Sequence, residues 1–149
     1  MTDRDVIQLF EQHHPTTQKD AETLGLNLVR FAHGCSRTVY KLTPTLVAKF
    51  VCGTTLQSEN EIEALEQIHN QPRFEEIRKY VPPLYYGNKK TGAILTKFYS
   101  IEVTYEEQKE LEPVIRKLED YGINDLFCMN FRRDENGNLI AIDLGHAHL

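Results

Sequence analysis

The sequence predicts an α+β fold, with a five-strand antiparallel sheet, one helix between its strands and a helical second lobe after it. Two observations support this. Short runs of β-branched and aromatic residues form a group of three and a later group of two, with turn residues between neighbours. A helical pattern separates the two groups, and others stand at the start and near the end of the chain. The 149 residues, 40% of them hydrophobic, suffice for one domain with its own core.

The first 25 residues predict a helical arm. Residues 3–13 have an apolar stripe, Thr2 can cap the helix, and Pro15 ends it. A shorter helix is expected over residues 17–24, closed by Gly25.

The sheet and its helix are expected within residues 26–100. The strands are predicted at residues 26–31, 38–42, 46–51, 81–87 and 92–98. Between the third and fourth strands, residues 58–69 have apolar residues on one helical face and Ser58 at the N-cap position.

The last third, residues 101–149, is expected to hold a helix and a hairpin. Residues 106–121 have a helical pattern, in which we expect Pro113 to break the helix or to mark its first turn. The Asn136-Gly137 turn between two apolar runs predicts a hairpin of residues 131–133 and 139–142.

Composition excludes several classes of protein. Lys and Arg total 17 against 22 Asp and Glu, a net charge of −5, and there is no basic stripe, so nucleic acid is not an expected partner. No apolar run approaches the roughly 18 residues of a membrane span. The acidic, amphipathic start does not resemble a signal peptide, and we expect a cytoplasmic protein. Cys35, Cys52 and Cys128 are too few and too far apart for a disulfide framework or a paired-cysteine zinc motif, and we expect free thiols.

The residues that carry chemistry gather near the end of the sequence. Asp125 follows the predicted last helix, Asn130 stands five residues later, and Asp143 follows the returning strand of the hairpin. The hairpin is expected to bring Asn130 and Asp143 together, and such an oxygen pair suits a magnesium ion. Asp125 would lie beside that ion, free to accept a hydroxyl proton.

The pattern Asp-Leu-x-x-x-Asn at residues 125–130, followed by Asp-Leu-Gly at 143–145, resembles the catalytic loop and metal-binding turn of the protein kinase-like superfamily, which includes aminoglycoside and choline kinases. The resemblance implies that Asp125 is the catalytic base and that Asn130 and Asp143 bind the metal. It also implies ATP and Mg²⁺ as cofactors, a kinase-like N-lobe over residues 26–100 and a reduced C-lobe over residues 101–149.

The upstream half extends the resemblance. Residues 32–40 resemble a glycine-rich nucleotide loop, in which Gly34 is the middle glycine and Val39 covers the adenine, and Ser36 is also expected to bind the nucleotide. Residues 95–100 resemble the hinge that meets the adenine edge, so Lys97 and Phe98 are expected to contact the nucleotide.

Lys49 resembles the strand lysine that holds the phosphates, and Glu61 resembles the helix glutamate that pairs with it, which adds both residues to the catalytic set. Glu61 shares a helix face with Leu65. The short separation from Lys49 leaves Glu59 and Glu63 as alternative partners.

Four positions depart from the family pattern. Ala32 and Arg37 stand where the loop has glycines, and Arg37 there would either clash with a phosphate or contact it. Ile123 and Phe127 replace polar residues that flank the catalytic Asp. Only six residues run from Leu144 to the end, so we expect either a longer natural chain or a minimal protein whose lobe a partner completes.

Two functions follow from this comparison. The first is an ATP- and Mg²⁺-dependent phosphotransferase, with a protein Ser/Thr or the chain itself as the favoured acceptor. The alternative is a pseudokinase scaffold that binds a partner protein without transferring phosphate.

The histidines have their own alternatives. His13, His14, His146 and His148 are enough for a zinc site, but exposed histidines near the two ends of the chain are the favoured interpretation. His146 is also near enough to the Asp-Leu-Gly motif to contact a phosphate.

Overall fold

The computed structural model describes residues 1–34 and 36–149. Cys35, which the sequence analysis placed in the glycine-rich loop and among the free thiols, lies outside the described residues. In chain order the helices and strands are α1 (Asp3–His13), α2 (Gln18–Thr23), β1 (Val29–His33), β2 (Arg37–Thr43), β3 (Leu46–Val51), α3 (Leu56–Asn70), β4 (Leu84–Gly87), β5 (Ile94–Lys97), β6 (Ile101–Glu102), α4 (Gln108–Asp120), β7 (Phe131–Arg133) and β8 (Leu139–Ala141). Three 3₁₀ helices are η1 (Pro72–Tyr80), η2 (Tyr105–Glu107) and η3 (Cys128–Asn130).

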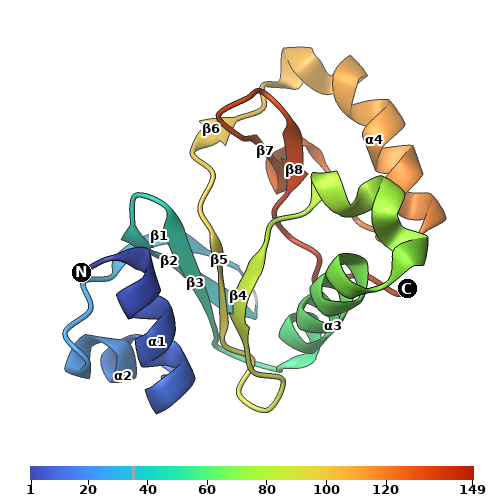
Figure 1. The fold of residues 1–149 in the computed structure, drawn as a ribbon. Coiled ribbons are helices and arrows are strands. Elements are labelled where there is room, and N and C mark those ends of the chain that lie inside the picture. The colour runs from blue at the N-terminus through green and yellow to red at the C-terminus, as the bar shows by residue number, and fades with distance from the viewer. Residues whose placement is uncertain (35) are drawn as a thin grey trace.

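The predicted α+β fold is confirmed. Five strands pair antiparallel in the spatial order β1-β2-β3-β5-β4 (Figure 1). Along the chain, α3 connects β3 to β4. The predicted terminal hairpin is also present, and β6 adds a third strand to it. With only two residues, β6 is too short to leave a pattern in the sequence.

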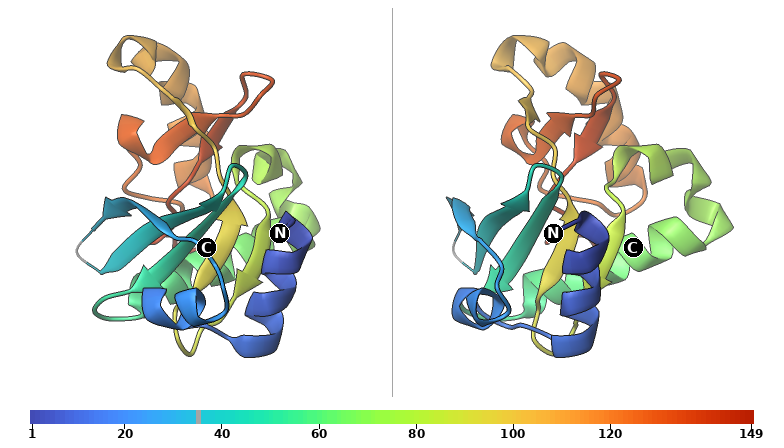
Figure 2. Two further views of the ribbon diagram at one scale, coloured as in Figure 1. Left: turned by 90° about the vertical axis from the view of Figure 1, so that its left-hand side faces the viewer. Right: turned by 60° about the vertical axis from the view of Figure 1, so that its left-hand side comes forward.

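The N-terminal helices pack on one face of the five-stranded sheet, and α3 lies on the other side (Figures 1 and 2). Thr2 and Asp5 form a reciprocal capping box at the start of α1. Phe10 is fully buried and stacks on Phe50, with 6.2 Å between ring centroids, and meets Tyr86 edge-on at 5.5 Å. Burying one such ring stabilises the fold by about 1.5–3 kcal/mol, so the predicted arm shares the core of the sheet.

Alternation along β3 positions the first functional side chain. Leu46, Ala48 and Phe50 belong to the core beneath α1. Side chains of successive strand residues point to opposite faces, so Val47 and Lys49 face the other side, where both line a cleft.

A second core holds the C-terminal half together. It joins one face of α3 to η1, α4, the hairpin and the tail, through buried side chains that include Leu65, Ile68, Phe74, Leu111, Leu118, Ile123, Phe131 and Leu144. Ile123 and Leu144 flank the stretches that carry Asp125 and Asp143. Both predicted motifs therefore rest on buried apolar anchors.

The start of α3 differs from the prediction. The helix begins at Leu56 with Thr55 at the N-cap, so Ser58 lies inside the helix and is fully buried rather than capping it. A Cβ on Gly92 would lie 3.3 Å from the Cβ of Ser58, which shows how closely the turn before β5 approaches the helix. Serine is small enough to let the turn approach the helix this closely. This tertiary contact explains the residue at position 58, and the capping pattern alone could not predict it.

The prediction for Pro113 is wrong, because α4 continues through it. Proline at this position leaves the carbonyl of Lys109 without its helical partner. Leu111 and Leu118, on either side of the proline, are both fully buried in the second core, and this packing offsets the lost hydrogen bond.

Two further segments differ from expectation. The first strand is shifted to Val29–His33, and all five of its residues are exposed, as suits an edge strand. Residues 72–80, which were left without a predicted element, form η1 and bury Phe74 and Ile77. Within residues 1–34 and 36–149, no helix has the length and apolar character needed to cross a bilayer.

Candidate active site

A cleft of about 340 Å³ lies between the five-stranded sheet and the C-terminal hairpin. This volume is in the range of small-molecule sites. Eight of the residues predicted to contact nucleotide or metal line it: Gly34, Ser36, Val39, Lys49, Lys97, Phe98, Asn130 and Asp143. The structure thus brings together residues that are more than 100 positions apart, while their roles stay predictions.

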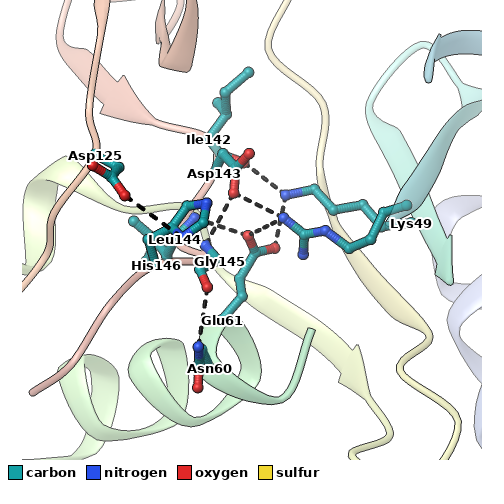
Figure 3. Close-up of polar contacts among 10 residues, drawn as sticks. Lys49, Asn60, Glu61, Asp125, Ile142, Asp143, Leu144, Gly145 and His146 are labelled. Atoms are coloured by element: carbon teal, nitrogen blue, oxygen red, sulfur yellow. Dashed lines mark hydrogen bonds and ion pairs between the residues drawn. The ribbon is translucent and has the colours of Figure 1, made fainter. Parts of the chain in front are cut away.

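Lys49 and Glu61 form a buried ion pair at the cleft. Lys49 Nζ lies 2.7 Å from Glu61 Oε2 and donates a second hydrogen bond to the carbonyl of Ile142 at 2.8 Å (Figure 3). The alternative partners are excluded, since Glu59 accepts from Thr55 and Glu63 accepts from a residue one turn later in the same helix.

The second oxygen of Glu61 holds the turn that carries Asp143. Glu61 Oε1 accepts the backbone N–H of Leu144 at 2.8 Å and also lies 3.3 Å from Arg37 Nη2. One carboxylate therefore connects α3 to β3, to β2 and to the Asp-Leu-Gly turn.

Arg37 occupies a position that sequence reasoning did not foresee. Its side chain is only 6% exposed, and Nη2 bridges Glu61 and Asp143, with 2.8 Å to Asp143 Oδ1. The loop pattern predicted a clash or a phosphate contact for Arg37, and the structure shows that its Nη2 binds two carboxylates. Burial disfavours its charge, but Glu61 and Asp143 outweigh that effect and raise the pKa of Arg37.

Asp143 is fixed by the turn that follows it. Its Oδ1 accepts the backbone N–H of Gly145 at 3.0 Å in addition to the bond from Arg37. A Cβ at Gly145 would lie 3.1 Å from Arg37 Nη2, so glycine allows the guanidinium to approach this closely. Burial opposes ionisation of Asp143, but the charges of Lys49 and Arg37 are stronger and lower its pKa.

Asn130 lies beside Asp143, as the predicted hairpin requires. The backbone carbonyl of Asn130 accepts the N–H of Ile142 at 2.8 Å, and both Asn130 and Asp143 line the cleft. The side-chain oxygen of Asn130, however, accepts the N–H of Phe127 at 2.8 Å and so serves its own loop.

These residues, as arranged, do not fit a magnesium ion. One oxygen of Asp143 is shared by Arg37 and Gly145, and the amide oxygen of Asn130 is engaged by Phe127. Magnesium needs near-octahedral oxygen ligands and is repelled by a neighbouring guanidinium. Among the residues that the structure describes, no three His, Cys, Asp or Glu side chains gather into a metal-binding group, which also leaves the zinc alternative without support.

Asp125 lies outside the cleft lining. It adopts a left-handed backbone conformation with φ 58°, its side chain is exposed, and its Oδ2 lies 3.6 Å from His146 Nδ1 (Figure 3). The structure therefore places the predicted base next to a histidine of the tail. Its loop leads directly to Met129 and Asn130 at the cleft.

The predicted hinge, residues 95–100, lines the cleft with side chains rather than with free backbone N–H groups. The N–H of Phe98 donates to the carbonyl of Thr45 at 2.9 Å and is not free for an adenine edge. Its ring packs edge-on against Phe31, with 5.3 Å between centroids, which makes an apolar wall. Beside it, burial and nearby groups raise the pKa of Tyr99 to about 12, so its hydroxyl stays a hydrogen-bond donor at neutral pH.

Among the residues that line the cleft, Gln57, Met129 and Arg132 were not predicted from the sequence to contact a ligand. Arg132 and Arg133 are neighbours on β7. Period-two alternation along the strand separates the two, because Arg132 lines the cleft whereas Arg133 binds Glu107 and Glu110. This alternation is the sequence signal from which the position of Arg132 could have been predicted.

The fold of this chain is similar to that of solved structures, although its sequence matches no family model. No family model matches the sequence, and no curated protein matches it. The chain is similar to a solved aminoglycoside phosphotransferase, described as "Structure of the streptomycin-ATP-APH(2")-IIa ternary complex". The TM-score is 0.48 with 13% sequence identity, and the match covers 86% of this chain and 42% of that one. The chain thus spans less than half the length of that protein.

Proposed function

We propose that this chain binds ATP in the cleft and transfers its terminal phosphoryl group to a hydroxyl acceptor. The observation that carries the proposal is the buried Lys49–Glu61 pair, which fixes an ammonium group at the floor of a cleft with apolar walls. A fixed cation suits phosphate oxygens, and walls such as Val39 and Phe98 suit a purine ring.

The transfer step assigns Asp125 the role of proton acceptor. The acceptor oxygen forms a bond to the terminal phosphorus, the bond from that phosphorus to the bridging oxygen of ADP breaks, and the hydroxyl proton moves to Asp125. The exposed position of Asp125, on the loop leading to Asn130, suits a hydroxyl that approaches from solvent. A protein Ser/Thr or the chain itself is the acceptor we propose.

Thermal unfolding with and without Mg-ATP tests the binding step. A ligand at 100 times its Kd adds about 2.7 kcal/mol of stability. We expect the wild type and the exposed-lysine control Lys89→Ala to shift alike and Lys49→Ala to shift less. No shift of the wild type at millimolar Mg-ATP would refute nucleotide binding.

Labelled phosphate tests the transfer step. We expect label from ATP on the chain or on an added protein acceptor, and we expect Asp125→Asn to lower its rate by about 10²–10⁴-fold, the contribution of a general base. Because Asp125 is exposed, the variant should fold as the wild type does. Unchanged transfer by Asp125→Asn would show that another group takes the proton.

Two observations favour a scaffold as the second candidate. Arg37 holds the predicted metal ligand Asp143, and Phe127 and Met129 expose large apolar side chains beside the catalytic loop. A scaffold would bind its partner equally well with and without ATP and after Lys49→Ala. A phosphotransferase would instead transfer no phosphate to its protein acceptor without ATP, and less after Lys49→Ala.

A further inference from the structure

Arg37 is the buried cation of this cleft that the proposed function leaves without a role. It begins β2, where the chain leaves the loop that contains Gly34 and Ser36. Its guanidinium is held by Glu61 at 3.3 Å and by Asp143 at 2.8 Å. An arginine buried against two carboxylates is strongly fixed in place, because its planar fork presents several donors at once.

The charges around it balance without a metal. Arg37 and Lys49 supply two positive charges, and Glu61 and Asp143 supply two negative ones, within a set of contacts of 2.7–3.3 Å. A divalent cation beside Asp143 would meet the guanidinium at close range. Such a cation would either displace the Arg37 guanidinium or be repelled by its positive charge.

The same corner of the cleft has spare hydrogen-bonding atoms. Nη1 of Arg37 and the hydroxyl of Ser36 are both buried, and neither has a hydrogen-bond partner among residues 1–34 and 36–149. Both residues line the cleft, as does Lys49. Buried polar groups without partners destabilise a fold, and phosphate oxygens are acceptors that suit an arginine fork and a hydroxyl.

We infer that Arg37 takes the place of a divalent cation at Asp143, so that Arg37, Ser36 and Lys49 bind the phosphates of a nucleoside triphosphate without a metal ion. The inference rests on the proposed function and specifies how its cleft recognises phosphate. It concerns binding of the nucleotide and leaves the transfer step as described above.

Calorimetric titration with ATP, in EDTA and in magnesium, is the direct test. The expected Kd values differ by less than about tenfold, or about 1.4 kcal/mol. Binding in magnesium alone would overturn the inference and leave the proposed function intact. Absence of binding in both buffers would instead refute the proposed function itself.

A phosphate series in EDTA tests the donors without any substitution. Adenosine, ADP and ATP are compared, and we expect ATP to bind at least about tenfold more tightly than adenosine, because each charge-assisted hydrogen bond to a phosphate adds affinity. Equal affinities would show that the phosphates are not recognised in the absence of metal, which contradicts the inference.

Substitution of Arg37 completes the design. Arg37→Gln should weaken ATP binding in EDTA by more than about tenfold, and magnesium should restore part of it, because Asp143 is then free. Arg30→Gln, on the exposed face of the neighbouring strand, is the matched control and should bind as the wild type does. If Arg37→Gln does not fold, Arg37→Lys keeps the charge with fewer donors and should bind with an intermediate Kd. Wild-type affinity of the folded Arg37 variant in EDTA would overturn the inference.

Discussion

The side chain of Glu61 accepts a hydrogen bond from the backbone N–H of Leu144 at 2.8 Å, across 83 positions of the sequence. The same carboxylate binds Lys49, so one buried side chain sets the distance between the sheet and the turn that carries Asp143. The predicted phosphate-binding lysine and the predicted metal-binding aspartate are therefore not independent features. A change at Glu61 displaces both.

Loss of Lys49 should destabilise the fold strongly. Lys49→Met keeps the apolar stem but leaves the buried Glu61 carboxylate with one charged partner fewer. Removing one member of a buried pair costs about 3–5 kcal/mol, and urea unfolding measures this. The control is Lys89→Ala, whose pair with Glu66 is half exposed and contributes less than about 1 kcal/mol. Equal losses in the two variants would show that the buried pair is not special.

Gly122 should tolerate no side chain, because the tail packs directly on it. A Cβ there would lie 2.0 Å from the carbonyl oxygen of His148, at φ +90°. Gly25 is a matched control with φ +86° and open space around it. Gly25→Ala should lose about 1–2 kcal/mol from backbone strain alone. Gly122→Ala should lose about 1–3 kcal/mol more from the clash, as measured by urea unfolding, and similar losses would mean that the tail moves aside freely.

Ser58→Ala should leave the stability unchanged or raise it slightly. The Ser58 hydroxyl is buried and has no hydrogen-bond partner in the described part of the chain, so Ser58→Ala removes an unsatisfied polar group rather than a cap. Thr2→Ala provides the contrast, since Thr2 forms a real capping box and its loss should cost about 1 kcal/mol. Thermal unfolding of both variants decides the point, and a loss at Ser58 as large as that at Thr2 would contradict the assignment.

Stability should depend on pH through Glu107. Hydrogen bonds from Arg133 and Thr104 lower its pKa from the ordinary 4.5, so the folded chain keeps this carboxylate ionised at lower pH than the unfolded chain does. Its contribution is complete above about pH 4.5 and is lost as the pH falls through the lowered value. Urea midpoints measured from neutral pH downward should therefore fall less steeply for Glu107→Gln than for the wild type. The neighbouring Glu106→Gln should follow the wild-type curve, and identical curves for all three would exclude the effect.

Local signals explain why much of the fold follows from the sequence. The first helix was predicted with its observed bounds because a cap, an apolar stripe and a proline agree over residues 2–15. The third strand was predicted at residues 46–51 because turn residues precede it and its side chains alternate. Ser58 and Pro113 were misjudged because tertiary packing, on Gly92 in one case and around Leu111 in the other, outweighed the local rule.

The sequence allowed a prediction of which residues lie at the site, but not of all the contacts between them. The predicted hairpin indicated that Asn130 and Asp143 would meet, and the family resemblance implied that Lys49 and Glu61 would pair. The structure places all four residues at or beside one cleft. The inward turn of Arg37 was not predictable, because it depends on two carboxylates that lie 24 and 106 positions away. No local pattern encodes which way such a side chain points.

These separations also bear on folding kinetics. The contacts that assemble the charged cluster join residues from 12 to 106 positions apart. Long loops must close before such contacts form, and chains dominated by distant pairings fold slowly. The β2–β3 hairpin can form early from its neighbours alone, whereas the cluster requires the beginning, middle and end of the chain at once. In a refolding experiment, binding of a fluorescent nucleotide should therefore appear only with the slowest phase, after most of the helical signal has returned.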